Sequence, residues 1–253
     1  MSANTLTATT VELRQELAGK GFIHLDQLVA PAHVASVREQ VEELFSRFDE
    51  LTATGVTHRI DHPDGRAGSM EIDRVTDCIP ELRASPLFQA CQAAAADLLQ
   101  CEPQLYYDHV IRKPAEIGIG TAWHQDRAYN LLEPKRGRAI FWIPLVDSAV
   151  ESGCMQFVPH SPAMGLLAHH PLPADPHKHT LEVDGDFDAQ AHAVPVRAGG
   201  ATVHQMLTLH MTAPNRSPVT RNAWIIHFAR PRNVGENLRV AARRLRGTRL
   251  PRL

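Results

Sequence analysis

The sequence predicts a mainly β fold, an antiparallel sandwich or barrel with helices packed on one side. Up to about residue 103 the apolar residues recur at helical spacing; from about residue 104 they alternate in short segments separated by Pro and Gly. A run of helices followed by many short strands is typical of a sheet covered by helices on one face. No repeat and no linker-like stretch divides the 253 residues, so we expect one domain, 1–253, with a single core.

Three helices are expected before residue 104, with a short strand between the first two. Each helical segment carries an apolar stripe, and Gly21 ends the first of them. The predicted helices span residues 10–17, 31–49 and 85–99, and the strand spans residues 21–25.

The second part, about 104–230, is expected to form the barrel. Its strands are recognised by alternation and by the turn residues that bound them. They are predicted at residues 105–112, 138–145, 155–158, 194–197, 201–209 and 222–228. A weakly periodic stretch, residues 163–193, reads as a long loop, either a cover over the substrate near the barrel mouth or, equally, an unrelated surface insertion. Residues 239–253 form a basic tail, expected to be exposed to solvent.

Composition narrows the class of function. Hydrophobic residues make up 43% and charged residues 21%, and the net charge of -2 gives no field that attracts nucleic acid or an anionic membrane. The four cysteines form no CxxC pair, which indicates reduced thiols. The N-terminus lacks a signal-peptide pattern, and no apolar run reaches the ~20 residues that span a membrane. We expect a cytoplasmic protein that acts on a small molecule, without nucleic-acid or membrane partners and of undetermined oligomeric state.

The segment Trp123-His124-Gln125-Asp126 is the first candidate site. In a strand, residues i and i+2 point to the same face, so His124 and Asp126 can converge on one point. Alone, this triplet reads equally as the polar end of a surface strand. His210, expected at the end of the strand 201–209, adds a second imidazole. Two imidazoles and one carboxylate form the facial set that holds Fe(II) and leaves positions open for oxygen chemistry.

Arg221 is the third element of the candidate site. Alternation along its strand places Arg221 on one face with Ala223, Ile225 and His227. A guanidinium that points into a barrel is costly unless an anion meets it, and its fork binds a carboxylate through two hydrogen bonds. This suits the distal carboxylate of a dicarboxylic co-substrate. The alternative is a structural salt bridge to an internal Asp or Glu.

The sequence resembles the phytanoyl-CoA dioxygenase family from the first helix to about Arg230. The matching motifs follow one another in the family's order: Asp108 to Lys113-Pro114, His124-Gln125-Asp126 with Tyr129, Trp142-Ile143-Pro144-Leu145 with Gly153, His210 with Pro214-Asn215 and Ser217, and Arg221 eleven residues past His210. Two motifs depart from the family. Pro159-His160-Ser161-Pro162 stands where Pro-Gly-Ser-His is usual, and Gly200-Ala201 where Gly-Asp is usual.

The resemblance implies a double-stranded β-helix, a jelly-roll, cupin-like barrel, and an Fe(II)- and 2-oxoglutarate-dependent dioxygenase that uses O2. It implies that His124, Asp126 and His210 bind iron and that Arg221 pairs with 2-oxoglutarate. It also implies co-substrate contacts from four further residues: Thr212, Lys113, Gln125 and Trp142. The expected reaction is oxidation of a small molecule, by default hydroxylation, in bacterial secondary metabolism. The carboxylate of Asp126 argues against halogenation.

Two alternatives remain open at this stage. The ligands can equally be those of a jelly-roll protein that binds zinc or another metal without redox use, because zinc sites use the same residue types. Oxidative demethylation of nucleic acid uses the same chemistry, although the net charge of -2 speaks against it.

Overall fold

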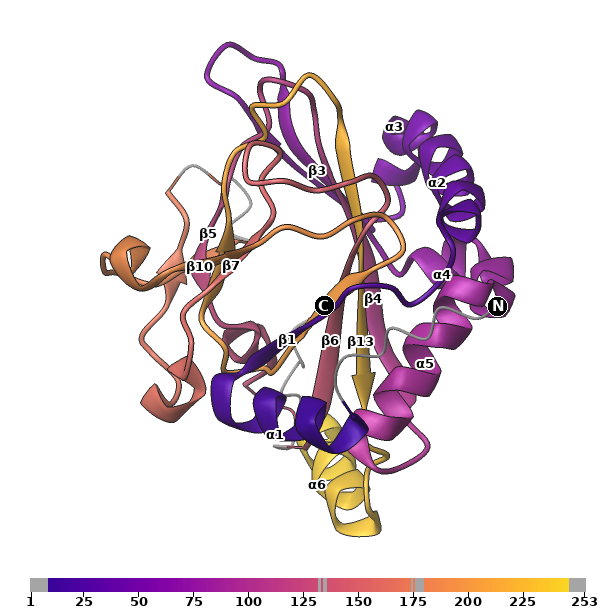
Figure 1. Ribbon diagram of the computed structural model, residues 1–253, viewed down its shortest axis with the longest axis vertical. Helices are drawn as coiled ribbons and strands as arrows, with labels where there is room; N and C mark the ends of the chain where they lie inside the picture. The colour runs from indigo at the N-terminus through magenta and orange to yellow at the C-terminus, as the bar shows by residue number, and fades with distance from the viewer. Residues whose placement is uncertain (1–8, 132, 134–135, 174, 176–179, 246–253) are drawn as a thin grey trace.

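Two antiparallel sheets face each other across the interior of the protein, and helices cover the outer face of the larger one (Figure 1). The structure, a computed structural model, describes residues 9–131, 133, 136–173, 175 and 180–245, with the backbone alone for 241–245. The larger sheet has the order β1 (Phe22–Leu25), β11 (Ala201–His204), β6 (Arg138–Pro144), β13 (Arg221–Ala229), β4 (Gln104–Lys113), β3 (Ala67–Asp73) and β2 (Thr57–Asp61). The smaller has the order β10 (His192–Val194), β7 (Met155–Phe157), β12 (His210–Thr212) and β5 (Thr121–His124).

The strand β13 shows how one sequence serves two layers. Ala223 and Ile225 face the interior between the sheets and pack with Trp142. Trp224 and Phe228 face outward into the core beneath the helices. The alternation predicted from the sequence is therefore confirmed, and so is the predicted fold class, a mainly β architecture with helices on one side.

Helices α1 (Thr10–Lys20), α2 (Pro31–Ser46) and α5 (Pro86–Leu99) confirm the three predicted helices. A capping box between Thr9 and Glu12 starts α1, and Gly21 ends it with a positive φ of 96° that a residue with a side chain rarely adopts. Shorter helices are α3 (Phe48–Thr52) and α4 (Val75–Cys78). Figure 1 shows α2, α3, α4 and α5 together on one side of β4 and β13.

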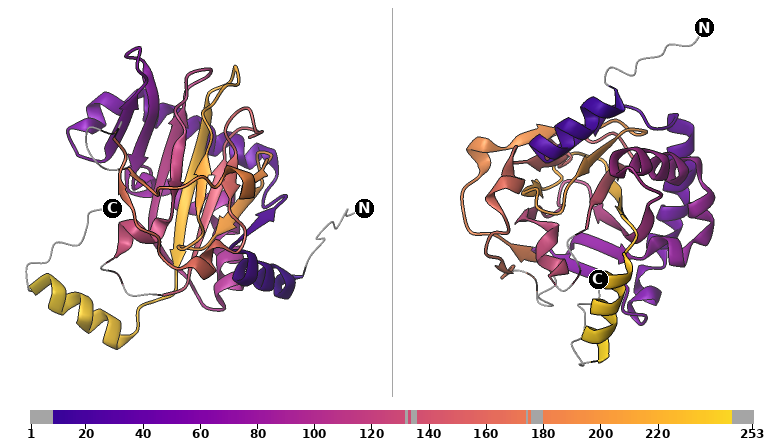
Figure 2. Two further views of the ribbon diagram at one scale, coloured as in Figure 1. Left: turned by 90° about the vertical axis from the view of Figure 1, so that its left-hand side faces the viewer. Right: turned by 90° about the horizontal axis from the view of Figure 1, so that it is seen from below.

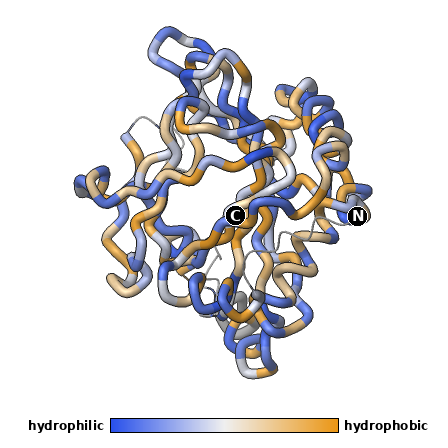
Figure 3. Tube along the Cα trace, in the orientation of Figure 1, coloured by the Kyte–Doolittle hydropathy of each residue, from blue (hydrophilic) through white to orange (hydrophobic). Residues whose placement is uncertain are grey.

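Residues 57–73, expected within the helical part, instead form the hairpin of β2 and β3, which extends the larger sheet. The signal for it is Asp64-Gly65, a turn pair between two alternating segments, with φ 85° at Gly65. The hydrophilic tip of this hairpin lies at the top of the molecule in Figure 3.

Two predicted strands are corrected. The stretch 201–209 is not one strand: β11 ends at His204, a turn closes where the N–H of Thr208 donates to the carbonyl of Gln205, and β12 begins at His210. The strand expected at 194–197 lies earlier, at His192–Val194, and Val196 makes only an isolated bridge to Ser148.

The long loop and the basic tail also contain regular structure. Within 163–193, β8 (His170–Pro171) pairs with β9 (Leu181–Glu182). The first part of the expected tail lies in α6 (Val234–Leu245), which projects from the body of the molecule in both views of Figure 2. Residues 246–253 lie outside the described part. None of the helices in the described ranges is long and apolar enough to cross a membrane.

We predict that Phe228→Ala lowers the free energy of unfolding by about 3–5 kcal/mol, because it leaves a cavity in the core. Phe228 is fully buried, with its ring 5.5 Å from that of Phe88 and 5.8 Å from that of Phe141. Urea denaturation measures the change. Val219→Ala, at a side chain that is 54% exposed, is the matched control and should stay within about 0.5 kcal/mol of the parent. Equal effects of the two substitutions would contradict the assigned core.

Candidate metal and co-substrate site

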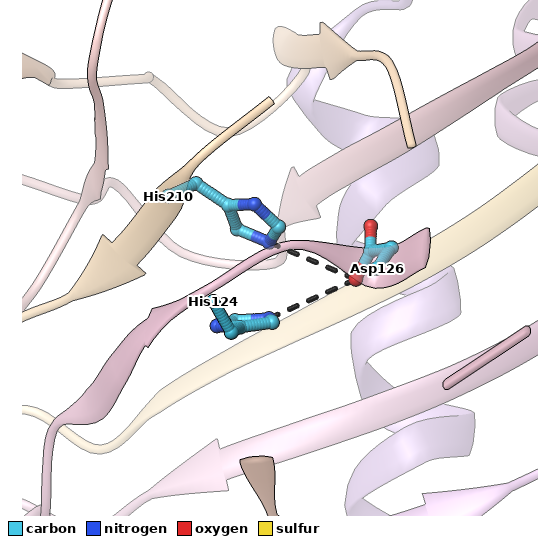
Figure 4. A group of neighbouring side chains, drawn as sticks. All are labelled: His124, Asp126 and His210. Atoms are coloured by element: carbon cyan, nitrogen blue, oxygen red, sulfur yellow. Dashed lines mark ion pairs between the residues drawn. The ribbon is translucent and has the colours of Figure 1, made fainter. Parts of the chain in front are cut away.

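His124, Asp126 and His210 converge at one point (Figure 4). The pairing of β5 with β12 places His210 directly opposite His124. The Oδ1 atom of Asp126 lies 3.7 Å from Nε2 of His124 and 3.8 Å from Nε2 of His210. We had expected Asp126 to lie in the same strand as His124. It is instead the first residue of a 3-10 helix, Asp126–Asn130. The i, i+2 relationship survives because Gln125 keeps an extended backbone, with φ -126° and ψ 126°.

Both imidazoles are held in the orientation that a metal requires. Nδ1 of His124 lies 2.8 Å from the carbonyl of Ala122, and Nδ1 of His210 lies 2.8 Å from the carbonyl of Thr208. A carbonyl oxygen can only accept a hydrogen bond, so Nδ1 of each ring is the donor and carries the proton. Each Nε2 therefore keeps its lone pair, directed at the point where the three side chains meet.

The ionisation states also suit a cation. Burial alone would raise the pKa of Asp126, but His210 and His204 lower it well below its usual value. Burial lowers the pKa of His124, and burial together with His124 and His204 lowers that of His210 well below the ordinary range. The site therefore presents one carboxylate and two neutral imidazoles, the forms that coordinate metal.

The donor set fits iron. One nitrogen from each imidazole and one carboxylate oxygen all lie within 4.8 Å of one another, close enough to share one ion. Two imidazoles and one carboxylate on one side leave the other coordination positions open, as in the non-haem Fe(II) sites.

His204 was missed by the sequence reasoning. It lies at the end of β11, is 2% exposed, and its Nε2 atom lies 3.0 Å from Oδ2 of Asp126. It thereby holds the second carboxylate oxygen of Asp126 and leaves Oδ1 for the ion. No local signal marks it, because it follows Ala-Thr-Val in a short apolar strand, where a histidine reads as a core residue.

Arg221 lies at the other end of the same cavity. The cavity has a volume of about 70 Å³ and is lined by both sheets, including Trp142, Met155 and Thr212. Arg221 is 1% exposed, and among the described residues its guanidinium donates only to the carbonyls of Ser152, at 3.5 Å, and Gly153, at 3.3 Å. Burial lowers the pKa of Arg221 to about 10.

No carboxylate of the described residues forms an ion pair with Arg221, and residues outside the described part contain no Asp or Glu in the sequence. The structural salt bridge that the sequence left open is therefore not found among the described residues. A fully buried cation without an acid in the protein is a site prepared for an external anion.

Lys113 is hydrogen-bonded to Thr212, a residue of the cavity lining. It is fully buried, and its Nζ donates to Oγ1 of Thr212 at 2.6 Å and to the carbonyls of Thr212 and Ala213, each at 3.2 Å. Burial and the charge of Arg221 lower its pKa well below the usual value. Because Lys113 donates to the Thr212 hydroxyl, the hydroxyl proton of Thr212 is free to donate into the cavity.

Gln125, expected to contact the co-substrate, lies elsewhere. Its side-chain amide donates to the carbonyls of Gly165 and Leu207 and accepts from the N–H of Leu167. It lines neither cavity at the metal site. Alternation explains this, because Gln125 stands between His124 and Asp126 and points the opposite way. Trp142 does line the cavity, with its ring 5.3 Å from the Arg221 guanidinium.

A second cavity, of about 120 Å³, continues from the metal site and is walled by the β2–β3 hairpin and β4. Its wall carries paired polar groups. Asp73 contacts Nε2 of His58 at 3.0 Å and accepts from the Tyr107 hydroxyl at 2.5 Å, and Glu71 lies 2.5 Å from Nδ1 of His109. The sequence reasoning missed His58, Glu71 and Asp73 because it missed the hairpin that carries them.

The segment 163–193 borders this second cavity. Asp175 and Thr180 line it, and the N–H of Leu181 donates to the hydroxyl of Tyr129 at 2.8 Å. Of the histidines expected in this segment, His169, His170 and His192 belong to no metal-binding group found in the described part. His177 and His179 lie outside the described residues.

Facing antiparallel sheets around two buried histidines and an aspartate, with a buried arginine beyond them, form a site of the kind that non-haem Fe(II) oxygenases use. The chain belongs to the phytanoyl-CoA dioxygenase (PhyH) family, whose model matches residues 17–223. The predicted family is confirmed.

Sequence relatives include phytanoyl-CoA dioxygenase domain-containing protein 1 of Danio rerio, 27% identical over 136 residues, and that of Mus musculus, 28% identical over 131 residues. These alignments cover 52% and 50% of the chain. The chain spans about half the length of these curated relatives, 46% and 45%.

Among solved structures, EvdO2 from Micromonospora carbonacea var. aurantiaca in complex with 2-oxoglutarate is similar, with a TM-score of 0.73 and 28% identity. The match covers 87% of this chain and 90% of that one. The 2-oxoglutarate-dependent carbocyclase SnoK from nogalamycin biosynthesis shares the fold, with a TM-score of 0.71 and 23% identity over 90% and 87% of the two chains.

We predict that His204→Ala weakens metal binding about 10–100-fold, because Asp126 loses the partner that orients it. Titration of the apo protein with Co(II) measures the affinity. His204→Gln, which can still donate to Asp126, should restore most of it, and His33→Ala, at an exposed position on α2, is the control. If the Gln variant is as weak as the Ala variant while both remain folded by circular dichroism, the hydrogen bond is not what matters.

Proposed function

We propose that the protein oxidises a small molecule with Fe(II), O2 and 2-oxoglutarate, with iron bound by His124, Asp126 and His210. One observation carries the proposal: the cavity that starts at these three ligands contains a fully buried arginine, Arg221, without an acidic partner among the described residues. A protein that bound zinc without redox use would have no need for this costly charge.

Each residue of the cavity has a role in this scheme. Bound iron with O2 and 2-oxoglutarate supplies the oxidising chemistry. The guanidinium of Arg221 binds the far carboxylate of 2-oxoglutarate, and the hydroxyl of Thr212 donates to the same group. Lys113 fixes Thr212 through the hydrogen bond from Nζ to Oγ1. Trp142 and Met155, both nearly fully buried, help to keep water out.

The substrate is placed in the second cavity, beside His124 and Asp126. Its polar wall contains Glu71 and the histidine and tyrosine partners of Glu71 and Asp73, and favours a small substrate that carries hydrogen-bond donors. Carboxylates at this position disfavour a phosphate backbone, which speaks against nucleic acid as the substrate.

Hydroxylation is the proposed outcome, and a role in bacterial secondary metabolism, a cytoplasmic location and a single domain over 1–253 stay predictions. The fold by itself does not select the outcome, because SnoK, with the same fold, is a carbocyclase. The proposed cover over the substrate, residues 163–193, is supported by the contacts of Asp175, Thr180 and Leu181 near the second cavity.

Succinate formation tests the proposal. The protein loaded with Fe(II) under air should convert 2-oxoglutarate to succinate, slowly without substrate and faster with a matching one. His124→Ala, Asp126→Ala and His210→Ala should each abolish it while the fold is retained, and His33→Ala should not change it. Full turnover by one of the three variants removes that residue from the site. No succinate from the iron-loaded parent, with or without a broad substrate screen, refutes the function.

We expect Arg221→Leu to weaken binding of 2-oxoglutarate by about 2–5 kcal/mol, because one partner of a buried charge pair is lost. The stability of the protein without ligand should stay the same or rise, since the unpaired buried charge is removed. Calorimetric titration of Ni(II)-loaded protein and urea denaturation measure the two effects, with Arg38→Leu on the exposed face of α2 as control. Unchanged 2-oxoglutarate affinity would make Arg221 a structural residue.

A further inference from the structure

A third cavity, of about 730 Å³, lies away from the metal site and shares no lining residue with the two cavities there. It lies between α1, the end of α5, the first residues of β6, the turn after β11 and the end of β13. Figure 1 shows α1 and the adjoining ends of α5, β6 and β13 at the bottom of the molecule, away from the tip of the β2–β3 hairpin. We call it the arginine cavity after the five arginines that line it: Arg14, Arg127, Arg136, Arg138 and Arg230.

No acidic side chain lines the arginine cavity, which contains neither Asp nor Glu among its described residues. The acid near it, Glu133, is occupied by Arg232 at 2.7 and 2.8 Å and reaches Arg136 only at 4.0 Å. Residues outside the described part add no acidic side chain, because the sequence has no Asp or Glu there. The cavity therefore carries a net positive charge.

Arg138 is buried, so the positive charge of the arginine cavity does not lie on the surface alone. It is 5% exposed, its guanidinium lies over the ring of Tyr106 at 3.5 Å, and Nη1 contacts the sulfur of Met206 at 3.6 Å. Its Nη2 has no hydrogen-bond acceptor among the described residues. Burial of a guanidinium with an unsatisfied N–H is costly, and an anion in the cavity that the other atoms of Arg138 line would lower that cost.

The rest of the lining is largely apolar. Leu17, Leu98, Leu99, Leu131, Leu166, Met206 and Leu207 surround the arginines. Leu131 and Leu166 are 56% and 43% exposed, so two of the largest exposed apolar side chains lie on the wall of this cavity. Apolar side chains that remain in water next to a cavity indicate an apolar ligand.

We propose that the arginine cavity binds a small amphipathic oxyanion, a molecule with one carboxylate or phosphate head and an aliphatic body. The head neutralises the charge of Arg138 and its neighbours, and the aliphatic body covers the leucines. The volume of about 730 Å³ suits a ligand of this size. This site is separate from the one proposed for 2-oxoglutarate, and its occupancy does not require iron.

Calorimetric titration with four ten-carbon probes tests the proposal: decanoate, decyl phosphate, decanol and decylamine. The protein is saturated with 2-oxoglutarate and Ni(II), so that the co-substrate site is filled. At least one of the two oxyanions should bind, and the comparison between them identifies the preferred head. Decanol and decylamine should bind at least tenfold more weakly, because they lack the negative charge.

Two variants locate the binding. Arg138→Gln removes the buried charge, and Leu166→Glu places an acid at an exposed position of the wall, where the fold tolerates it; each should weaken oxyanion binding at least tenfold. Arg38→Gln, an exposed arginine on α2, is the matched control and should bind as the parent does. Equal binding of decanol and the oxyanions, parent-like binding by the folded Leu166→Glu variant, or binding that 2-oxoglutarate abolishes would each overturn the proposal. None of these results depends on turnover, so the proposed oxygenase activity stands or falls separately.

Discussion

The antiparallel pairing of β5 with β12 is the contact on which the metal site depends. It sets His210 opposite His124, and both rings are then fixed by carbonyls two residues earlier in the chain, at Ala122 and Thr208. A slip of one residue in this pairing would turn one imidazole to the other face of the sheet and separate the ligands. The register of these short strands is therefore set by function as much as by packing.

Charge is segregated inside the protein in a way that a core built for stability alone would not show. Arg221 and Lys113 are buried together without an acidic partner among the described residues, whereas Glu71 lines the adjoining cavity together with the histidine and tyrosine partners of Glu71 and Asp73. The cavity that contains Arg221 suits a dicarboxylate, and the cavity that contains Glu71 suits hydrogen-bond donors. A dicarboxylate and a substrate with hydrogen-bond donors would therefore favour different cavities beside the metal site.

The sequence predicts most of the fold and the metal-binding candidates because these depend on local periods and motifs. The helices α1, α2 and α5, the strands β4, β6 and β13, and the convergence of His124 with Asp126 follow from alternation and spacing. The placing of His210 beside them follows from the donor set and the family resemblance. The β2–β3 hairpin was missed although Asp64-Gly65 signals it. His204 and the arginine cavity were not predictable, because they arise where segments distant in sequence meet: Arg14, Arg138 and Arg230 share no local pattern.

The turn between β11 and β12, residues 205–209, borders both the metal site and the arginine cavity. On one side it connects His204, which holds Asp126, to His210. On the other side Gln205, Met206 and Leu207 line the arginine cavity. Its backbone is tied at both faces, since the carbonyl of Met206 accepts from the N–H of Arg127 and that of Leu207 accepts from the amide of Gln125. Arg127 and Gln125 flank Asp126 in the chain. The same turn therefore borders the arginine cavity and is hydrogen-bonded to the two residues that flank the carboxylate ligand.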